Sequence, residues 1–289
     1  MDPAIAGLVI LSAIIHPLRD LTLKGNGYPE STYLGVTAAW IGIAAGQILA
    51  EGGSFHLPAE VWVNAGLSSL GLLAYYGGTM AALKRGDMSI YYPIIRSSPL
   101  FIILVSIAFL DQSYSAIVIG GIALAMAGVF FLQRGPSGRL LSHPSAFGFA
   151  VLAMVGSGTY AISDAFAVQH VSPATFLFYV YSLLTLAFTL LFLLTKPKRR
   201  NALSHLFGGW TRSPWRVLFA ATTSYVSYLL ILIAYEGGGE PAVVNAVRQL
   251  SVPVSVLMSA WVLKESRIPA RFAWSLVLGL GIAAIVIHG

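Results

Sequence analysis

The sequence predicts an all-α polytopic membrane protein with ten transmembrane helices, arranged as two inverted five-helix repeats. Of the 289 residues, 57% are hydrophobic and only 10% are charged, whereas soluble chains average about 25% charged residues. The mean hydropathy of +0.79 agrees with this difference. A bilayer core about 30 Å thick needs about 20 apolar residues per helix. The chain therefore has room for ten helices joined by short connections, and we expect no separate soluble domain.

Ten apolar segments separated by polar residues mark the expected helices. In the first half they cover residues 3–23, 31–50, 60–83, 88–109 and 114–133, and in the second half residues 146–170, 173–195, 215–235, 241–262 and 269–288. The first segment lacks a basic amino-terminal region and a small-residue cleavage site, so we interpret it as a retained helix and not as a signal peptide. Ser172-Pro173 and Ser213-Pro214 are typical helix starts, with a hydroxyl at the N-cap followed by proline.

The basic residues predict an orientation in the membrane. All Lys and Arg residues except Arg96 and Arg248 lie in the odd-numbered connections or at the span ends next to them, and the even-numbered connections and both termini carry none. Because cytoplasmic loops are enriched in Lys and Arg, we expect a multi-pass protein of the cell inner membrane with both termini outside the cytoplasm. The Lys and Arg residues of these cytoplasmic loops then account for the net charge of +6. We expect the lipid bilayer as a partner, and no nucleic acid.

Residues 1–140 and 141–289 are the two expected repeats. The same distance along the chain separates Pro99 from Pro253 and Asp111 from Glu265. Five helices per half is an odd number, so the second copy is inverted relative to the first. Inverted repeats are typical of secondary transporters, whose binding site lies near the bilayer midplane between the repeats.

These motifs carry a family resemblance. Residues 82–96 with Pro99, and residues 244–253 with the later Leu263-Lys264-Glu265, resemble the two EamA repeats of the drug/metabolite transporter superfamily, in its ten-span branch. The resemblance covers essentially the whole chain. It implies alternating access with exchange or proton-coupled transport of small metabolites, often export of amino acids, and in some branches flipping of lipid-linked sugars. The first span departs from many relatives by carrying His16-Pro17 in place of a Trp-containing stretch.

Two arginines predict the chemistry of the substrate. Arg96 and Arg248 lie deep inside spans and approach the midplane from opposite sides. Charges inside a span are rare and usually functional, and two guanidiniums can hold a carboxylate or phosphate in bidentate fashion. In the alternative interpretation, an internal acid such as Asp164, Glu236 or Glu240 neutralises each arginine, which then only joins helices.

Further polar and aromatic side chains complete the predicted substrate site. Tyr92, Tyr160, Trp40 and Asn245 are the expected additional contacts, because such side chains commonly wall a cavity for an organic molecule. The alternative is that the aromatic residues only pack between helices. A small-molecule substrate is therefore the expected partner.

Three titratable residues are candidates for proton coupling, and three prolines for helix kinks. His16, Asp164 and Asp20 lie in or near spans, where His and a partly desolvated Asp can exchange protons near neutral pH. Pro17, Pro99 and Pro253 remove backbone hydrogen bonds and should open the helix locally. The alternatives are that Asp20 is solvated and that His16 only satisfies backbone groups freed by Pro17.

Other functional classes are disfavoured. Ser157 lacks the Gly-x-Ser-x-Gly spacing of a hydrolase, no His-Glu-x-x-His motif is present, and the chain has no Cys. We expect no enzyme activity, no cofactor and no metal.

Gly42 and Gly46 predict a close helix contact, within the chain or in a homodimer. The expected function is secondary active transport, with export as the direction, of a small metabolite with an anionic or zwitterionic group, such as an amino acid or organic acid. Flipping of a lipid-linked substrate and an intramembrane enzyme are the alternatives.

Overall fold

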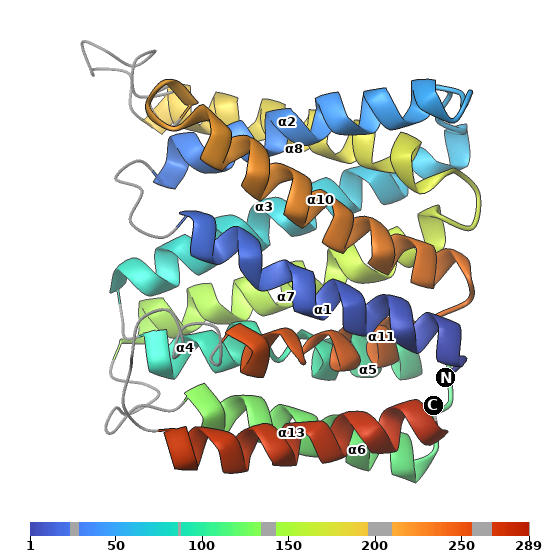
Figure 1. Cartoon of the computed structure of the whole chain (residues 1–289), viewed down its shortest axis with the longest axis vertical. Helices are drawn as coiled ribbons and strands as arrows, with labels where there is room; N and C mark the ends of the chain where they lie inside the picture. Colours follow the sequence, from blue (N-terminus) through green and yellow to red (C-terminus); the bar gives the residue numbers. More distant parts are fainter. Residues whose placement is uncertain (24–28, 86–87, 134–142, 196–209, 256–267, 289) are drawn as a thin grey trace.

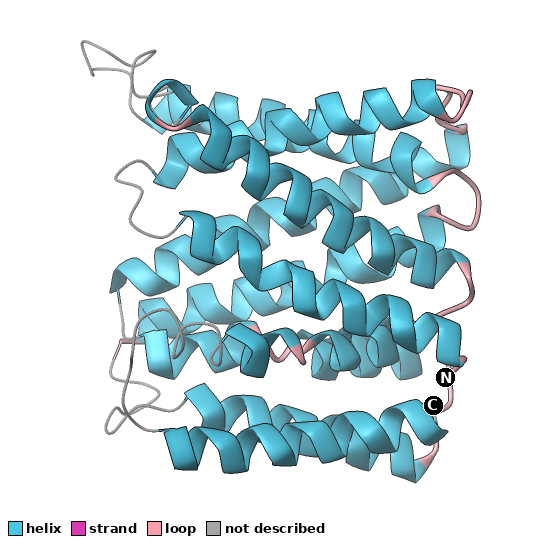
Figure 2. Ribbon diagram, viewed as in Figure 1, coloured by secondary structure: helices cyan, strands magenta, loops and turns pink. Residues whose placement is uncertain are grey.

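The computed structural model shows an all-helical chain (Figure 2). It describes residues 1–23, 29–85, 88–133, 143–195, 210–255 and 268–288, and no strand occurs in these ranges. The side chain of Asp20 lies outside the described part. Five segments are long and apolar enough to cross a membrane: Ser31–Ala50, Tyr91–Phe109, Pro144–Ala167, Pro173–Leu194 and Pro214–Glu236. The chain is therefore a membrane-type helical protein.

The helices lie side by side across the molecule (Figure 1). The first half of the chain contains α1 (Pro3–Leu23), α2 (Pro29–Ala50), the 3-10 turn η1 (Ala59–Val61), α3 (Trp62–Arg85), α4 (Met88–Ile95), α5 (Ser98–Phe109) and α6 (Ala116–Gln133). The second half contains α7 (Pro144–Ala167), α8 (Pro173–Thr195), α10 (Pro214–Glu236), α11 (Pro241–Arg248) and α13 (Ile268–His288). Both termini lie at one edge, where the Met1 amino group donates a hydrogen bond of 3.1 Å to the Val286 carbonyl.

A proline interrupts the segment predicted as one helix over residues 88–109. α4 ends at Ile95 and α5 begins at Ser98. Pro99 has no backbone N–H, so it cannot donate to the Ile95 carbonyl four residues earlier. Around it, backbone amides donate to carbonyls three residues away, from Ser97 to Ile94 and from Leu100 to Ser97, both at 3.0 Å. The ladder changes from α-helical to 3-10 spacing, which separates the two helices.

The second half contains an equivalent interruption. α11 ends at Arg248, and helical backbone resumes at Ser251. Pro253 cannot donate to the carbonyl of Gln249, and the amides of Gln249 and Leu250 donate to carbonyls three residues earlier, at 3.1 and 3.0 Å. Pro17 differs, because α1 continues through it as one helix. The sequence pattern thus placed the two interruptions correctly, while Pro17 does not end its helix.

Small residues allow the helices to approach closely. α3 packs along α7, α6 along α13, α1 along α10 and α2 along α8. A Cβ atom added to Gly71 of α3 would lie 2.8 Å from the Gly156 carbonyl oxygen of α7, and one added to Gly281 of α13 would lie 2.5 Å from the Ala125 amide nitrogen of α6. Side chains cannot fit at such separations. Close backbone packing of this kind is typical of helix pairs in membranes.

Gly42 and Gly46 do not form a contact of this kind within the described chain. An added Cβ atom at either position would meet no described heavy atom within 4 Å. The interpretation of Gly42 and Gly46 as a close contact between helices of one chain is therefore wrong, and the homodimer stays a prediction.

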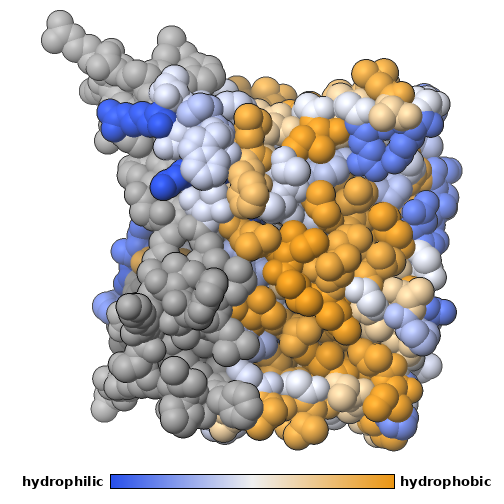
Figure 3. All heavy atoms as spheres, in the orientation of Figure 1, coloured by the Kyte–Doolittle hydropathy of each residue, from blue (hydrophilic) through white to orange (hydrophobic). Residues whose placement is uncertain are grey.

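The visible face of the molecule is apolar over its middle, with hydrophilic residues toward its edges (Figure 3). This distribution suits a surface surrounded by lipid.

Candidate functional site

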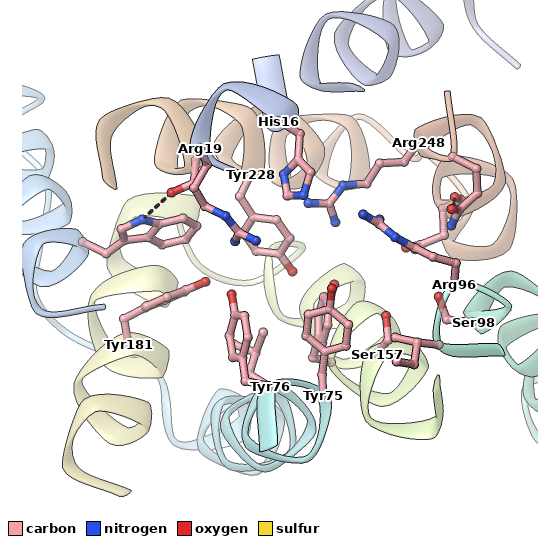
Figure 4. Close-up of a pocket in the computed structure, with 17 residues that line it drawn as sticks. His16, Arg19, Tyr75, Tyr76, Arg96, Ser98, Ser157, Tyr181, Tyr228 and Arg248 are labelled. Carbon is pink, nitrogen blue, oxygen red and sulfur yellow. Dashed lines mark hydrogen bonds between the residues drawn. The ribbon is translucent and has the colours of Figure 1, made fainter. Parts of the chain in front are cut away.

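A cavity lies where the two interrupted helices meet α1, α2, α3, α7, α8 and α10 (Figure 4). It contains about 610 Å³ of empty space, counting its opening. The polar and aromatic side chains on its walls are those of His16, Arg19, Trp40, Tyr75, Tyr76, Arg96, Ser98, Ser157, Tyr160, Tyr181, Ser224, Tyr228, Asn245, Arg248 and Gln249. Both halves of the chain contribute to these walls.

The two predicted arginines each lie at a helix interruption. Arg96 lies between α4 and α5, and Arg248 is the last residue of α11. Both guanidiniums point into the cavity and toward one another (Figure 4). Because the backbone leaves its helical path at these points, it can present long side chains that an uninterrupted helix would direct elsewhere. The structure thus brings together two residues that lie far apart in sequence.

Aromatic rings hold both arginines. The Arg96 side chain donates a hydrogen bond of 2.8 Å to the Tyr92 hydroxyl, and its guanidinium carbon lies 5.1 Å from the Tyr92 ring centroid. The Arg248 guanidinium carbon lies 5.2 Å from the ring centroid of Tyr228. Cations over an aromatic face are stabilised by about 0.5–2 kcal/mol. Tyr92 is not among the residues that line the cavity in the described part of the chain, so it positions Arg96 and does not face a ligand there.

None of the three acids considered as neutralising partners pairs with Arg248. Glu240 caps α11 by accepting a 3.0 Å hydrogen bond from the Val243 amide, and it also accepts from Tyr114. Glu236 is exposed. Asp164 accepts from Ser68 at 2.5 Å and from Tyr228. Within the described residues, no carboxylate lies within 4.0 Å of the Arg248 guanidinium, so none forms a salt bridge with it, although Asp164 interacts with Arg248 electrostatically over a longer distance.

Several buried polar atoms on the cavity walls have no hydrogen-bond partner among the described residues. They are Nδ1 of His16, Nε of Arg248 and Oε1 of Gln249. A buried polar atom left without a partner costs about 1–3 kcal/mol. Such atoms are expected where a polar ligand completes the hydrogen bonding. The cavity walls therefore offer hydrogen-bonding atoms that a polar ligand or water could use.

Asp164 lies behind the cavity wall. It is 1% exposed and does not line the cavity, although Tyr228, which donates to it, does. The Tyr228 ring in turn supports Arg248. Asp164 and Ser68 thus fix the position of Tyr228, and through it the position of Arg248. His16, by contrast, lines the cavity directly.

Aromatic side chains form the opposite part of the walls. The Trp40 ring stacks on Tyr181 with centroids 4.0 Å apart, and its Nε1 donates to the Ser224 hydroxyl at 3.1 Å. Tyr160 lies between Tyr75 and Tyr228, with centroids 6.0 and 6.1 Å away. Trp40 and Tyr160 therefore line the cavity as predicted. So does Asn245, whose side-chain amide donates to the Tyr235 hydroxyl at 2.6 Å.

The sequence interpretation counted Arg19 with the first connection and did not propose it for the substrate site, although it placed Arg19 on the same face of the first span as His16. α1 has the predicted bounds, and Arg19 lies inside it, three residues after His16. Residues three apart share one helical face, and both side chains reach the cavity. Tyr75, Tyr76, Tyr181 and Ser98 were also missed, because nothing in the local sequence distinguishes a cavity-facing residue from a packed one.

Contacts close the structure at the edge where the termini lie. Tyr114, between α5 and α6, donates to Glu240 at the start of α11. Burial and this carboxylate acceptor both raise the pKa of Tyr114, so its hydroxyl stays protonated and able to donate. Gln169, just after α7, donates to the Tyr235 carbonyl of α10 at 2.7 Å. These bonds tie the ends of α7, α10 and α11 and the α5–α6 connection together.

Comparison with known proteins adds evidence on the fold. No family model matches the chain, and no curated protein sequence matches it. Among solved structures, one described as "Crystal structure of protein" superposes with a TM-score of 0.76, covering 98% of this chain and 96% of that chain at 15% identity. The chain therefore shares its fold with a protein of nearly the same length.

Proposed function

We propose that this chain is a secondary transporter of the EamA type in the drug/metabolite transporter superfamily, which exports a small anionic or zwitterionic metabolite by alternating access. The observation that carries this proposal is Arg248, whose guanidinium lies at a helix interruption, faces the cavity and pairs with no carboxylate in the described chain. A fixed cation of this kind suits an anionic group of a ligand. Interrupted helices that meet at a cavity are typical of transporter binding sites.

The helix packing supports ten spans in two inverted repeats. If α4 with α5 counts as one span, and α11 with the helical backbone that resumes at Ser251 counts as another, every half has five. A two-fold relation between the halves exchanges the pair α1–α10 with the pair α7–α3, and both pairs pack extensively. It maps the pairs α2–α8 and α6–α13 onto themselves, and these also pack closely. The prolines that interrupt the two helices lie at matching positions.

The ends of the helices support the proposed orientation and direction. Lys84 and Arg85 end α3, and Arg212 and Arg216 flank the start of α10, at the edge opposite the termini (Figure 1). The positive-inside rule makes this edge cytoplasmic in the inner membrane. A membrane potential that is negative inside then favours outward movement of an anion, by about 2.3 kcal/mol per charge at 100 mV.

A ligand screen tests the proposal. Purified protein in detergent is heated with amino acids, organic acids, phosphorylated metabolites and organic cations. An anion or zwitterion at 100 times its dissociation constant is expected to stabilise the protein by about 2.7 kcal/mol, which corresponds to a rise in melting temperature of roughly 5 to 10 °C. The stabilising compound should also show saturable counterflow in proteoliposomes. Stabilisation by organic cations alone would contradict the proposal.

Proton coupling is the second part of the proposal, and the cavity position of His16 favours it over Asp164. His16→Gln is expected to lower substrate-driven proton movement on the order of tenfold or more, measured with a pH-sensitive dye in proteoliposomes, while substrate counterflow persists. Asp164→Asn replaces one acceptor by a donor, so we expect a loss of stability of about 1–3 kcal/mol. If both variants keep substrate-driven pH changes at the wild-type level, neither residue couples protons.

A further inference from the structure

Asp164 is a buried acid that neither lines the cavity nor forms a salt bridge with Arg248. Both of its oxygens accept hydrogen bonds from hydroxyls, Oδ1 from Ser68 of α3 at 2.5 Å and Oδ2 from Tyr228 of α10. Burying a carboxylate is costly even when it is hydrogen-bonded. Neutral side chains would link α3, α7 and α10 at a lower cost, which points to a role that needs the charge.

Tyr228 connects Asp164 to the cavity. Its hydroxyl donates to Asp164, and its ring lines the cavity, where the Arg248 guanidinium carbon lies 5.2 Å from the ring centroid (Figure 4). Donation to a carboxylate increases the electron density of the ring, and an electron-rich ring attracts a cation more strongly. The rings of Trp40 and Tyr160 pack beside Tyr228, with centroids 5.9 and 6.1 Å away. Carboxylate, ring and guanidinium therefore form one connected series from α7 through α10 to α11.

The ring, and not the hydroxyl, is what Tyr228 contributes to the anion site. A tyrosine hydroxyl has a single hydrogen to donate, and in Tyr228 this hydrogen is directed to Asp164. The hydroxyl therefore has no donor left for an anion in the cavity. Asp164 also interacts with Arg248 electrostatically over a longer distance, so the carboxylate acts on the arginine both directly and through the ring.

We infer that Asp164 is a positioning residue of the binding site, which holds Arg248 in place for the anionic group of the ligand by fixing the Tyr228 ring beside it. This inference rests on the proposed anion binding and assigns Asp164 a role other than proton coupling. A purely electrostatic role has the opposite consequence, because a negative charge near the site repels an anion and its removal would tighten binding. Removal of a positioning residue weakens binding, and does so only while Arg248 is present.

The first test observes Arg248 without any ligand. Arginine side chains are labelled with a nitrogen isotope in the full-length protein in detergent, and the Nε–H resonance of Arg248 is identified by its absence in Arg248→Gln. An aromatic ring shifts the resonances of nuclei close to it. We therefore expect this signal to move or broaden in Tyr228→Phe and in Asp164→Ala, since both variants lose the hydrogen bond that fixes the ring.

Tyr225→Phe is the matched control for Tyr228→Phe. Tyr225 lies three residues earlier on α10, is also buried, and donates to Gln47 at 2.7 Å without lining the cavity. The substitution removes the same group from the same helix and keeps the ring. We expect it to leave the Arg248 signal unchanged.

The second test measures the consequence for ligand binding, with succinate titrated by calorimetry. Tyr228→Phe and Asp164→Ala are each expected to weaken succinate binding by about fivefold to tenfold, the effect of losing the support of one cation–π contact. In an Arg248→Gln background, either change should alter the affinity by less than about twofold, because the residue through which it acts is gone. Melting temperatures of the ligand-free variants establish that each one is folded.

Other outcomes would overturn the inference. Tighter succinate binding in Asp164→Ala would mean that the carboxylate acts only as a charge. An Arg248 signal unchanged in both variants, or effects on affinity that are equal with and without Arg248, would mean that Asp164 and Tyr228 only join helices. Absence of succinate binding by the wild-type protein would count against the proposed function for organic acids, and the Arg248 signal would then decide the role of Asp164 by itself.

Discussion

Arg248→Gln is expected to weaken binding of the anionic metabolite by about 30-fold, which corresponds to about 2 kcal/mol. The guanidinium lies at the end of α11, faces the cavity and has no carboxylate partner in the described chain. Its removal breaks no salt bridge among the described residues, so the loss should appear mainly in ligand affinity and much less in stability. Calorimetric titration of the purified variant, together with its ligand-free melting temperature, measures both quantities.

Arg216→Gln is the matched control for this prediction. Arg216 is an exposed arginine in the first turn of α10, outside the cavity. We expect its affinity for the anion to stay within about twofold of wild type, because screened surface charges contribute little. A similar loss of affinity in both variants would mean that overall charge attracts the anion and that the Arg248 site is incorrect. An unchanged affinity in Arg248→Gln, with a lowered melting temperature, would mean that this arginine is structural.

Gly281→Ala is expected to destabilise the protein by about 3 kcal/mol, lowering its melting temperature on the order of 10 °C. The added Cβ atom would lie 2.5 Å from the Ala125 amide nitrogen and 2.6 Å from the Gly121 carbonyl oxygen. Both are backbone atoms, so no side chain can rotate away, and α6 and α13 must separate. Since packing between small residues holds helices together in lipid, the separation loses many contacts at once. Thermal unfolding in detergent measures the effect.

Gly279→Ala provides a control on the same helix. An added Cβ atom at Gly279 would meet no described atom within 4 Å. Alanine also favours the helix over glycine by about 1 kcal/mol in soluble hosts, so we expect an unchanged or slightly raised melting temperature. If Gly281→Ala and Gly279→Ala lower the melting temperature equally, the α6–α13 contact does not require glycine. Anion binding should persist in both variants, because neither residue lines the cavity.

The sequence predicted the class of protein and much of its local structure. Low charge and long apolar segments predict membrane helices, since the bilayer selects helices with apolar surfaces. The interruptions near Pro99 and Pro253 also follow from local chemistry, because a proline removes a specific backbone hydrogen bond wherever it stands. Arg96 and Arg248 could be proposed for the same site because each is a rare charge within an apolar segment. Each of these sequence features can be recognised from a short stretch of neighbouring residues.

The site required the folded chain. Tyr92 and Tyr160 are both tyrosines in apolar helices, yet Tyr160 lines the cavity and Tyr92 holds Arg96 from behind. Gly42 and Gly281 are both glycines in helices, yet only Gly281 lies against another helix of the described chain. Periodicity groups residues into faces of a helix, but it does not reveal which face meets which neighbour.

The sequence by itself determined that this protein is helical, suited to a membrane, and interrupted at two prolines near two arginines that lie within apolar segments. Only the tertiary structure decided that Arg19 joins these arginines at one cavity and that Asp164 accepts a hydrogen bond from Tyr228 and forms no salt bridge with Arg248. The physical reason is the distance along the chain over which each interaction acts. Backbone hydrogen bonding and hydrophobic periodicity act over a few residues, whereas a cavity forms between segments brought together by packing across the whole chain.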